Sequence, residues 1–172
     1  MKNQEYPLIT TTNKVTETVP MYFPVSLTKL FVMSFCTFGL YEIYWFYKNW
    51  SLIKQHDEEE NIMPALRAFF AIFFCYSLFT RIQETAEAQE LRISLATGFL
   101  TSGWIIFTLL WRLPAPYWMI SFLAVFFLLP VQSAVNDINS SENPQHDPNS
   151  RFTKLNIATA LIGISILILG II

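Results

Sequence analysis

The chain has 172 residues, of which 53% are hydrophobic, 16% aromatic and 14% charged. Soluble proteins carry about 25% charged residues, and a chain of this length cannot hide so much apolar surface in a water-soluble core. The net charge of −2 supplies no basic field for binding nucleic acid. The composition therefore predicts an all-α, polytopic helical membrane protein whose partner is the lipid bilayer, and it argues against nucleic acid as a partner.

Residues 1–24 are rich in threonine and other polar residues, with prolines at positions 7 and 20. This pattern predicts a disordered N-terminal tail, followed by a single helical membrane domain over residues 25–172. The tail lacks the continuous apolar core of a secretory signal peptide. The first membrane segment is therefore expected to act as its own insertion signal.

The segment at about 26–50 changes character half-way along. It is apolar from Leu30 to Leu40, and six of the ten residues 41–50 are aromatic. Tyrosine and tryptophan prefer the headgroup level, and glycine is a common break point in a helix. We expect either a half-embedded helix that turns at 38–39 into an interfacial helix, or a tilted fifth span, and the aromatic density favours the former. The predicted interfacial belt consists of Tyr41, Tyr44, Trp45, Tyr47 and Trp50.

Four further apolar blocks predict transmembrane helices, because each is about as long as the hydrocarbon core requires. Pro64 opens the first block, which should continue as a helix past Arg81 through good helix formers. The tight connector 113–116 contains two prolines and should force an antiparallel hairpin. Small residues in the second and fourth blocks suit close helix contacts. The predicted spans are at about 62–81, 93–111, 117–134 and 155–172.

The distribution of lysine and arginine predicts a cytoplasmic N-terminus under the positive-inside rule. This holds whether segment 26–50 crosses the membrane or not. The two arrangements differ in the C-terminus, which is inside with four spans and outside with five. The most direct test is a reporter fused at Ile172.

Glu42 and Arg67 are the charged residues within the apolar segments. An acid at mid-bilayer costs about 2.5–3.5 kcal/mol and usually marks a function or a partner, whereas an interfacial position removes most of that cost. Three interpretations stay open for Glu42. It is a structural acid at the interface, or one half of a polar pair with Arg67 or Lys48 that locks two helices, or an ion or proton site.

Two His-Asp pairs, His56-Asp57 and His146-Asp147, raise the question of a metal site. In both threading arrangements their connectors, 51–61 and 136–154, lie on opposite sides of the membrane and cannot share an ion. Each pair alone offers too few ligands for structural zinc. No catalytic motif is present, and the two cysteines lie in apolar blocks. The sequence thus predicts no catalytic residue, no cofactor and no metal.

Three short stretches, 27–30 (LTKL), 37–41 (TFGLY) and 44–50 (YWFYKNW), carry a resemblance. They resemble the opening signature of small bacterial inner-membrane proteins that are classed as a domain of unknown function. The resemblance implies a bacterial cytoplasmic membrane and brings no activity with it.

We expect a non-enzymatic protein that acts through helix–helix contacts as a scaffold, an assembly factor or a subunit of a complex. Its expected partner is another membrane protein or a second copy of the chain. The support is the lack of a recognisable catalytic set together with the small-residue faces of the second and fourth blocks. The alternatives are a small oligomeric transporter or channel and, after it, a lipid-modifying membrane enzyme.

Overall fold

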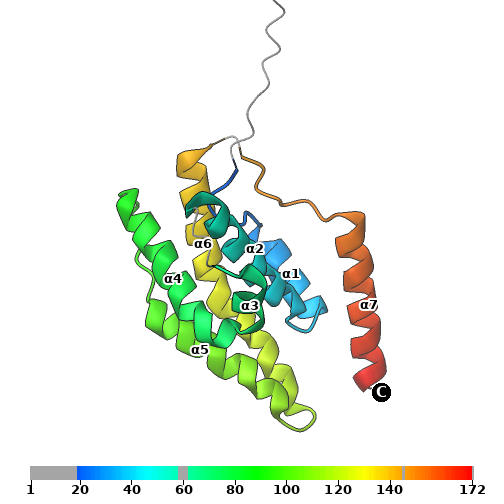
Figure 1. Cartoon of the computed structure of the whole chain (residues 1–172). Coiled ribbons are helices and arrows are strands. Elements are labelled where there is room, and N and C mark those ends of the chain that lie inside the picture. Colours follow the sequence, from blue (N-terminus) through cyan, green and yellow to red (C-terminus); the bar gives the residue numbers. More distant parts are fainter. Residues whose placement is uncertain (1–18, 58–61, 145, 172) are drawn as a thin grey trace, which may run out of the picture.

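The computed structural model describes residues 19–57, 62–144 and 146–171. Over these residues the chain is all-helical and contains no strand, which agrees with the predicted class. Figure 1 shows the helices packed along one another. The elements are α1 (Leu27–Cys36), α2 (Leu40–Asp57), α3 (Pro64–Phe69), α4 (Ala71–Ala88), α5 (Thr97–Leu109), η1 (Leu110–Arg112), η2 (Tyr117–Ala124), α6 (Val125–Glu142) and α7 (Lys154–Ile171).

The predicted break between 38 and 39 separates α1 from α2. Phe38 has φ 55° and Gly39 has φ 82°, so two successive residues lie in the left-handed region and end the first helix. The Thr37 hydroxyl bridges the break, because it donates to the Met33 carbonyl at 2.7 Å and accepts from the Tyr41 amide at 2.9 Å. The chain therefore reverses direction here.

The two helices form a hairpin whose ends lie together. The Phe23 amide donates to Oδ1 of Asn49 at 3.1 Å, and Nε2 of His56 lies 3.1 Å from the Pro20 carbonyl oxygen. Residues on either side of the hairpin are thus in contact. Segment 26–50 folds back on itself, so the arrangement with a turn at 38–39 holds and the tilted fifth span does not.

The block predicted as the span 62–81 is two helices. Pro64 starts α3 as expected, but the helix ends at Phe69 and, after Phe70, α4 begins at Ala71. α3 packs against α2, and α4 then runs on to Ala88, as the helix formers after Arg81 predicted.

The block predicted as the span 93–111 forms a shorter helix. α5 has 13 residues and begins at Thr97. The preceding residues are not helical, and Gln83 holds them in place: its Oε1 accepts from the Leu95 amide at 2.7 Å and its Nε2 donates to the Ile93 carbonyl at 3.3 Å. The connector 113–116 does produce the predicted hairpin, since α5 and η1 pack against η2.

The prediction of four transmembrane helices is therefore wrong for the described residues. In the part of the chain that the structure describes, only Tyr117–Glu142, with 26 residues, is both long enough and apolar enough to cross a membrane. The break at Phe70 and the late start of α5 shorten two of the predicted spans, and Leu27–Cys36 and Lys154–Leu169 count as shorter apolar helices. Pro130 lies inside α6 without ending it.

The helices run between two unlike ends (Figure 1). One end of the bundle is formed by segment 19–26, the last turns of α2, α4 and α6, and the connector 143–153. We call it the polar end. Tyr22 links these elements, because its hydroxyl lies 2.7 Å from Oγ1 of Thr85 in α4 and its amide donates to Oδ1 of Asn139 in α6 at 3.1 Å. The opposite end carries the turn 37–39, the connector 113–116 and the last turn of α7.

The predicted N-terminal tail overlaps the polar end. Its residues 1–18 lie outside the described residues. The prediction ended the tail at residue 24, whereas Tyr22 and Phe23 are already buried in the core. The reason is that side chains of α6 bind the backbone of this segment. Nδ2 of Asn139 donates to the Tyr22 carbonyl at 2.9 Å, and Nε2 of Gln132 donates to the Phe23 carbonyl at 3.3 Å.

The two His-Asp connectors were predicted to lie on opposite sides, and this is wrong. His56 contacts Pro20, while the connector that contains His146 supplies Asn149, which accepts from Nζ of Lys29 at 2.8 Å. Both connectors therefore lie at the polar end. Within the described part of the chain, no three histidine, cysteine or acidic residues gather where they could hold a metal ion.

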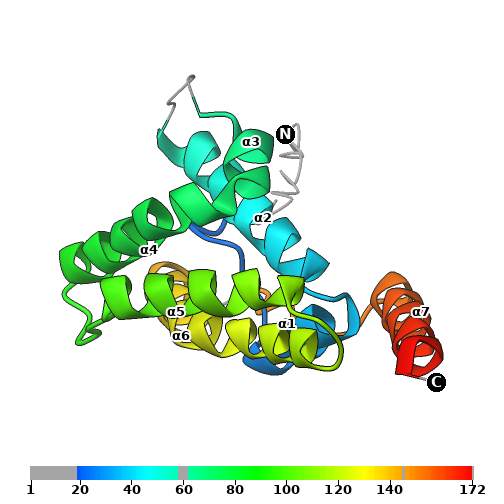
Figure 2. The same cartoon turned by 90° about the horizontal axis from the view of Figure 1, so that it is seen from below.

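α7 stands apart from the other helices in both views, beside α1 (Figures 1 and 2). The contact depends on Gly163, where a Cβ atom would overlap the carbonyl oxygen of Cys36. The predicted small-residue contacts are thus present at Gly163 and also at Gly103, whose missing side chain makes room for the ring of Phe127. Gly98 has no neighbour at this distance.

Candidate functional site

The predicted polar pair of Glu42 and Arg67 is not formed. Glu42 is in the first turn of α2, is 6% exposed, and accepts a hydrogen bond from Nε1 of Trp104 at 2.7 Å. The Arg67 guanidinium instead stacks 4.3 Å from the ring centroid of Trp50 and 5.4 Å from that of Phe74. A planar, weakly hydrated cation packs well on aromatic faces. The two charges therefore serve different contacts.

The predicted interfacial belt divides between the two faces of α2. Tyr44 and Tyr47 are exposed, which fits the prediction. Trp45 and Trp50 are fully buried and Tyr41 is nearly so, which contradicts it. Tyr41 and Trp45 are spaced i, i+4 and share the face that packs into the bundle, where Trp45 donates from Nε1 to Oε1 of Gln132 in α6. Trp50 lies on another face of α2, where Arg67 of α3 covers its ring.

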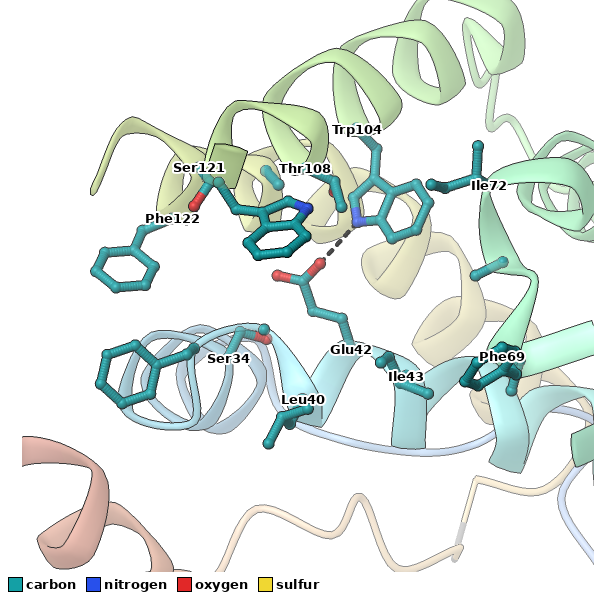
Figure 3. Close-up of a pocket in the computed structure, with 16 residues that line it drawn as sticks. Ser34, Leu40, Glu42, Ile43, Phe69, Ile72, Trp104, Thr108, Ser121 and Phe122 are labelled. Carbon is teal, nitrogen blue, oxygen red and sulfur yellow. Dashed lines mark hydrogen bonds between the residues drawn. The ribbon is translucent and has the colours of Figure 1, made fainter. Parts of the chain in front are cut away.

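Glu42 lies on a cavity of about 400 Å³ at the end of the bundle away from the polar end. The cavity is bounded by α1, the turn 37–39, α2, α3, α4, α5, η1 and η2, so most of the chain contributes to it. Figure 3 shows the Glu42 side chain rising from α2 toward Trp104 of α5, with Phe122 on one side and Phe69 on the other. Aromatic and aliphatic side chains form most of its walls.

The polar atoms of the cavity are not fully paired. The Ser34 hydroxyl in α1 and the Thr108 hydroxyl in α5 line the cavity, are buried, and have no hydrogen-bond partner among the described residues. Of the lining residues, only Glu42 has an ionisable side chain, and no cationic residue in the described part of the chain pairs with it. Six buried side-chain atoms among the described residues lack a partner, and two of them belong to residues that line this cavity together with a buried carboxylate. Buried polar groups in native proteins are nearly always satisfied, so the carboxylate and the two hydroxyls together point to a ligand.

A family model described as "Domain of unknown function (DUF4234)" matches residues 25–115. The chain belongs to the DUF4234 family. The match extends beyond the residues on which the sequence resemblance rested, and it agrees with the expected domain-of-unknown-function group. The DUF4234 region includes α1–α5 and η1, and therefore Glu42, Ser34, Trp104 and Thr108, whereas η2, α6 and α7 follow it. No curated protein and no solved structure matches the chain.

The sequence pointed to Glu42 and missed the other polar groups of the cavity. Trp104, Thr108 and Trp111 are spaced i, i+4, i+7, which places them on one face of a helix. That spacing was the available signal inside an otherwise apolar block. It could not show that this face meets Glu42, because Trp104 and Glu42 are 62 residues apart in the sequence.

Proposed function

We propose that the protein is a non-enzymatic integral protein of the bacterial cytoplasmic membrane that acts through helix–helix contacts, as a scaffold, an assembly factor or a subunit of a complex. The observation that carries the proposal is the apolar surface on the helices away from the polar end. Phe69 is 74% exposed, Phe73 76%, Phe99 69% and Leu169 75%. Soluble monomers rarely expose large apolar patches, and a bilayer would cover this one.

The 26-residue helix Tyr117–Glu142 further supports a membrane location. In a soluble protein a helix this apolar is mostly enclosed, but only 39% of its apolar window is buried within the chain. Its polar residues, from Gln132 onward, lie at the polar end, where they bind segment 22–25. The helix therefore changes from apolar to polar along its length, as expected for one that enters a bilayer from the polar end.

The basic residues support a cytoplasmic polar end and hence a cytoplasmic N-terminus. Helices α2 and α4 end at the polar end, and α1 and α7 begin at it. Arg112 lies at the opposite end, beside the connector 113–116. Positive charge concentrates on the cytoplasmic side of membrane proteins. Since α7 runs away from the polar end, the same reasoning points its last described turn toward the other side of the membrane. The described basic residues at or next to the polar end are Lys29, Lys48, Lys54, Arg81, Arg92, Arg151 and Lys154.

The first experiment tests membrane insertion and orientation. Vesicles that contain the protein are washed with alkaline carbonate, and the protein should remain in the membrane. A reporter that is active only outside the cytoplasm, fused after Ile172, should be active, while the same reporter fused before Met1 should be inactive. Release by carbonate would overturn the membrane location, and an inactive C-terminal fusion would overturn the orientation.

The second experiment tests helix contact as the function. α7 contacts α1 through Gly163, and its other faces expose large aliphatic side chains, so it is the helix best placed to bind a partner. A photo-crosslinking residue at Ile162, which is 61% exposed, should give a defined protein adduct in intact cells. The matched control is Phe73 of α4, which is 76% exposed but lies on a different helix. Lipid adducts alone at both positions would contradict the scaffold proposal.

The cavity favours a second candidate, a small oligomeric transporter. A single buried acid in an apolar segment is a feature of membrane transport sites. Glu42→Gln separates the candidates: loss of flux in proteoliposomes with normal accumulation in the membrane would support transport, whereas lower accumulation would support a structural role.

A further inference from the structure

We propose that the cavity around Glu42 is a binding site for an organic ammonium ion, a protonated amine carried on an apolar body. This inference does not depend on the scaffold proposal, and it would supply the substrate class of the second candidate. It rests on the charge, the volume, the walls and the unpaired hydroxyls of the cavity.

The first observation is the buried acidic side chain of Glu42. Glu42 is 6% exposed, its single described hydrogen bond comes from an uncharged indole, and none of the described cations pairs with it. An ionised carboxylate in apolar surroundings loses its hydration and needs a compensating positive charge. The cavity beside the carboxylate provides the room for one.

The volume decides against a bare ion. At about 400 Å³ the cavity falls in the range of sites for small organic ligands, roughly 300–1,000 Å³. A hard metal ion is a few ångströms across and takes about six to eight oxygen ligands. Among the described residues, the cavity offers one carboxylate and the hydroxyls of Ser34, Thr108 and Ser121. These oxygens are too few for a hard metal ion, and such an ion would leave most of the cavity unused.

The walls select a cation with an apolar body. Trp104 and Trp111 of α5 and η1, together with Phe69 and Phe122, supply aromatic surface around the carboxylate. Indole faces attract organic cations most strongly among the aromatic side chains, and the attraction grows when water is excluded. The same rings would cover the hydrocarbon part of the ligand. Leu40, Phe69 and Trp111 are exposed at the rim, so an amphiphilic amine can enter from the apolar surface.

The hydroxyls favour an ammonium group that still has N–H bonds. Ser34 is 2% exposed and its Oγ has no partner; the Thr108 Oγ1 is equally buried and unpaired. Figure 3 draws them on either side of the Glu42 carboxylate, one from α1 and one from α5. A primary ammonium has three N–H donors, and the carboxylate and the two hydroxyls provide three acceptors. A quaternary ammonium would leave both hydroxyls unsatisfied.

The test uses the full chain purified in a nonionic maltoside detergent and a matched pair of probes, 2-phenylethylammonium and the neutral 2-phenylethanol. Binding is measured by equilibrium dialysis at neutral pH. The wild type should bind the ammonium at least tenfold more tightly than Glu42→Gln, because the amide keeps an acceptor for Trp104 and loses the charge. The alcohol should bind both proteins weakly and equally. Glu90→Gln, which removes an exposed carboxylate, should match the wild type.

Equal affinity of wild type and Glu42→Gln for the ammonium would overturn the proposal, as would equal binding of the ammonium and the alcohol by the wild type. Should Glu42→Gln fail to fold, the double variant Ser34→Ala/Thr108→Val decides. It keeps the charge and the shape, so a several-fold loss of affinity for the ammonium supports the site, and no loss overturns it.

The amine could be free or could belong to a lipid headgroup, and a competition arm separates these sources. Dihexanoyl phosphatidylethanolamine carries a primary ammonium, and dihexanoyl phosphatidylglycerol is its control without one. Displacement of bound 2-phenylethylammonium by the ethanolamine lipid alone assigns the site to a headgroup. Retained binding in the presence of both lipids assigns it to a free amine.

Discussion

The polar end and the cavity around Glu42 both bury polar side chains, but they differ in how many of these side chains have hydrogen-bond partners. At the polar end, Gln132, Asn136 and Asn139 of α6 hydrogen-bond the backbone of segment 22–25. In the cavity, by contrast, two hydroxyls are unpaired and Glu42 has one neutral donor. A satisfied network stabilises and specifies a fold, whereas an unsatisfied one lowers stability unless something else occupies it. His146 Nε2 in the connector 143–153 is also unpaired, so the contrast is between the α6 network and the cavity rather than between two whole ends. It supports a structural role for that network and agrees with the binding that we propose for the cavity.

The largest expected effect comes from breaking the satisfied network with Asn139→Leu. Both hydrogen bonds to the Tyr22 backbone would be lost, and two buried groups would have no partner. We expect the free energy of unfolding to fall by about 2–5 kcal/mol, measured by circular dichroism during unfolding in mixed detergent micelles. Asp137→Leu on the exposed face of α6 is the control and should change it by less than about 0.5 kcal/mol. Equal effects of the two substitutions would deny the network its structural role.

Arg67→Gln should have an intermediate effect, because Arg67 joins α3 to α2 and α4 between the two regions. Removal of the cation stacked 4.3 Å from the centroid of the Trp50 ring should lower the free energy of unfolding by about 1–2 kcal/mol. The double variant Glu42→Gln/Arg67→Gln should equal the sum of the single variants within about 0.5 kcal/mol. A larger coupling energy would show that Glu42 and Arg67 interact, as the sequence suggested.

The smallest effect on the free energy of unfolding is expected in the cavity, where the two substituted hydroxyls have no partner among the described residues. Ser34→Ala and Thr108→Val should leave the free energy of unfolding unchanged or raise it by up to about 1 kcal/mol, because each removes a buried group without a partner. Thr37→Val is the matched control, since that hydroxyl makes two hydrogen bonds, and it should lower stability by about 1–2 kcal/mol. Losses of the same size at all three positions would show that the cavity hydroxyls have structural partners.

Helix α2 shows most clearly what could be predicted from the sequence and what could not. The glycine at 39 and the change from aliphatic to aromatic residues predicted the break that the structure has, because a left-handed turn and a polarity change are local properties. The same residues could not show which aromatic side chains face inward. That depends on the rotation of α2 against α6, and Trp45 meets Gln132 across 87 positions of sequence.

By itself the sequence determined an all-helical chain, a reversal at 38–39, a second at 113–116 and a carboxylate that apolar surroundings would have to accommodate. Helix propensity, turn residues and hydrophobicity act over a few residues, so these features could be predicted from neighbours along the chain. Only the tertiary structure decided that residues 22–25 bind α6, that both polar connectors lie at one end, and that Glu42 meets Trp104 in a cavity. Each of these depends on contacts between residues far apart in the chain, which local pattern does not contain.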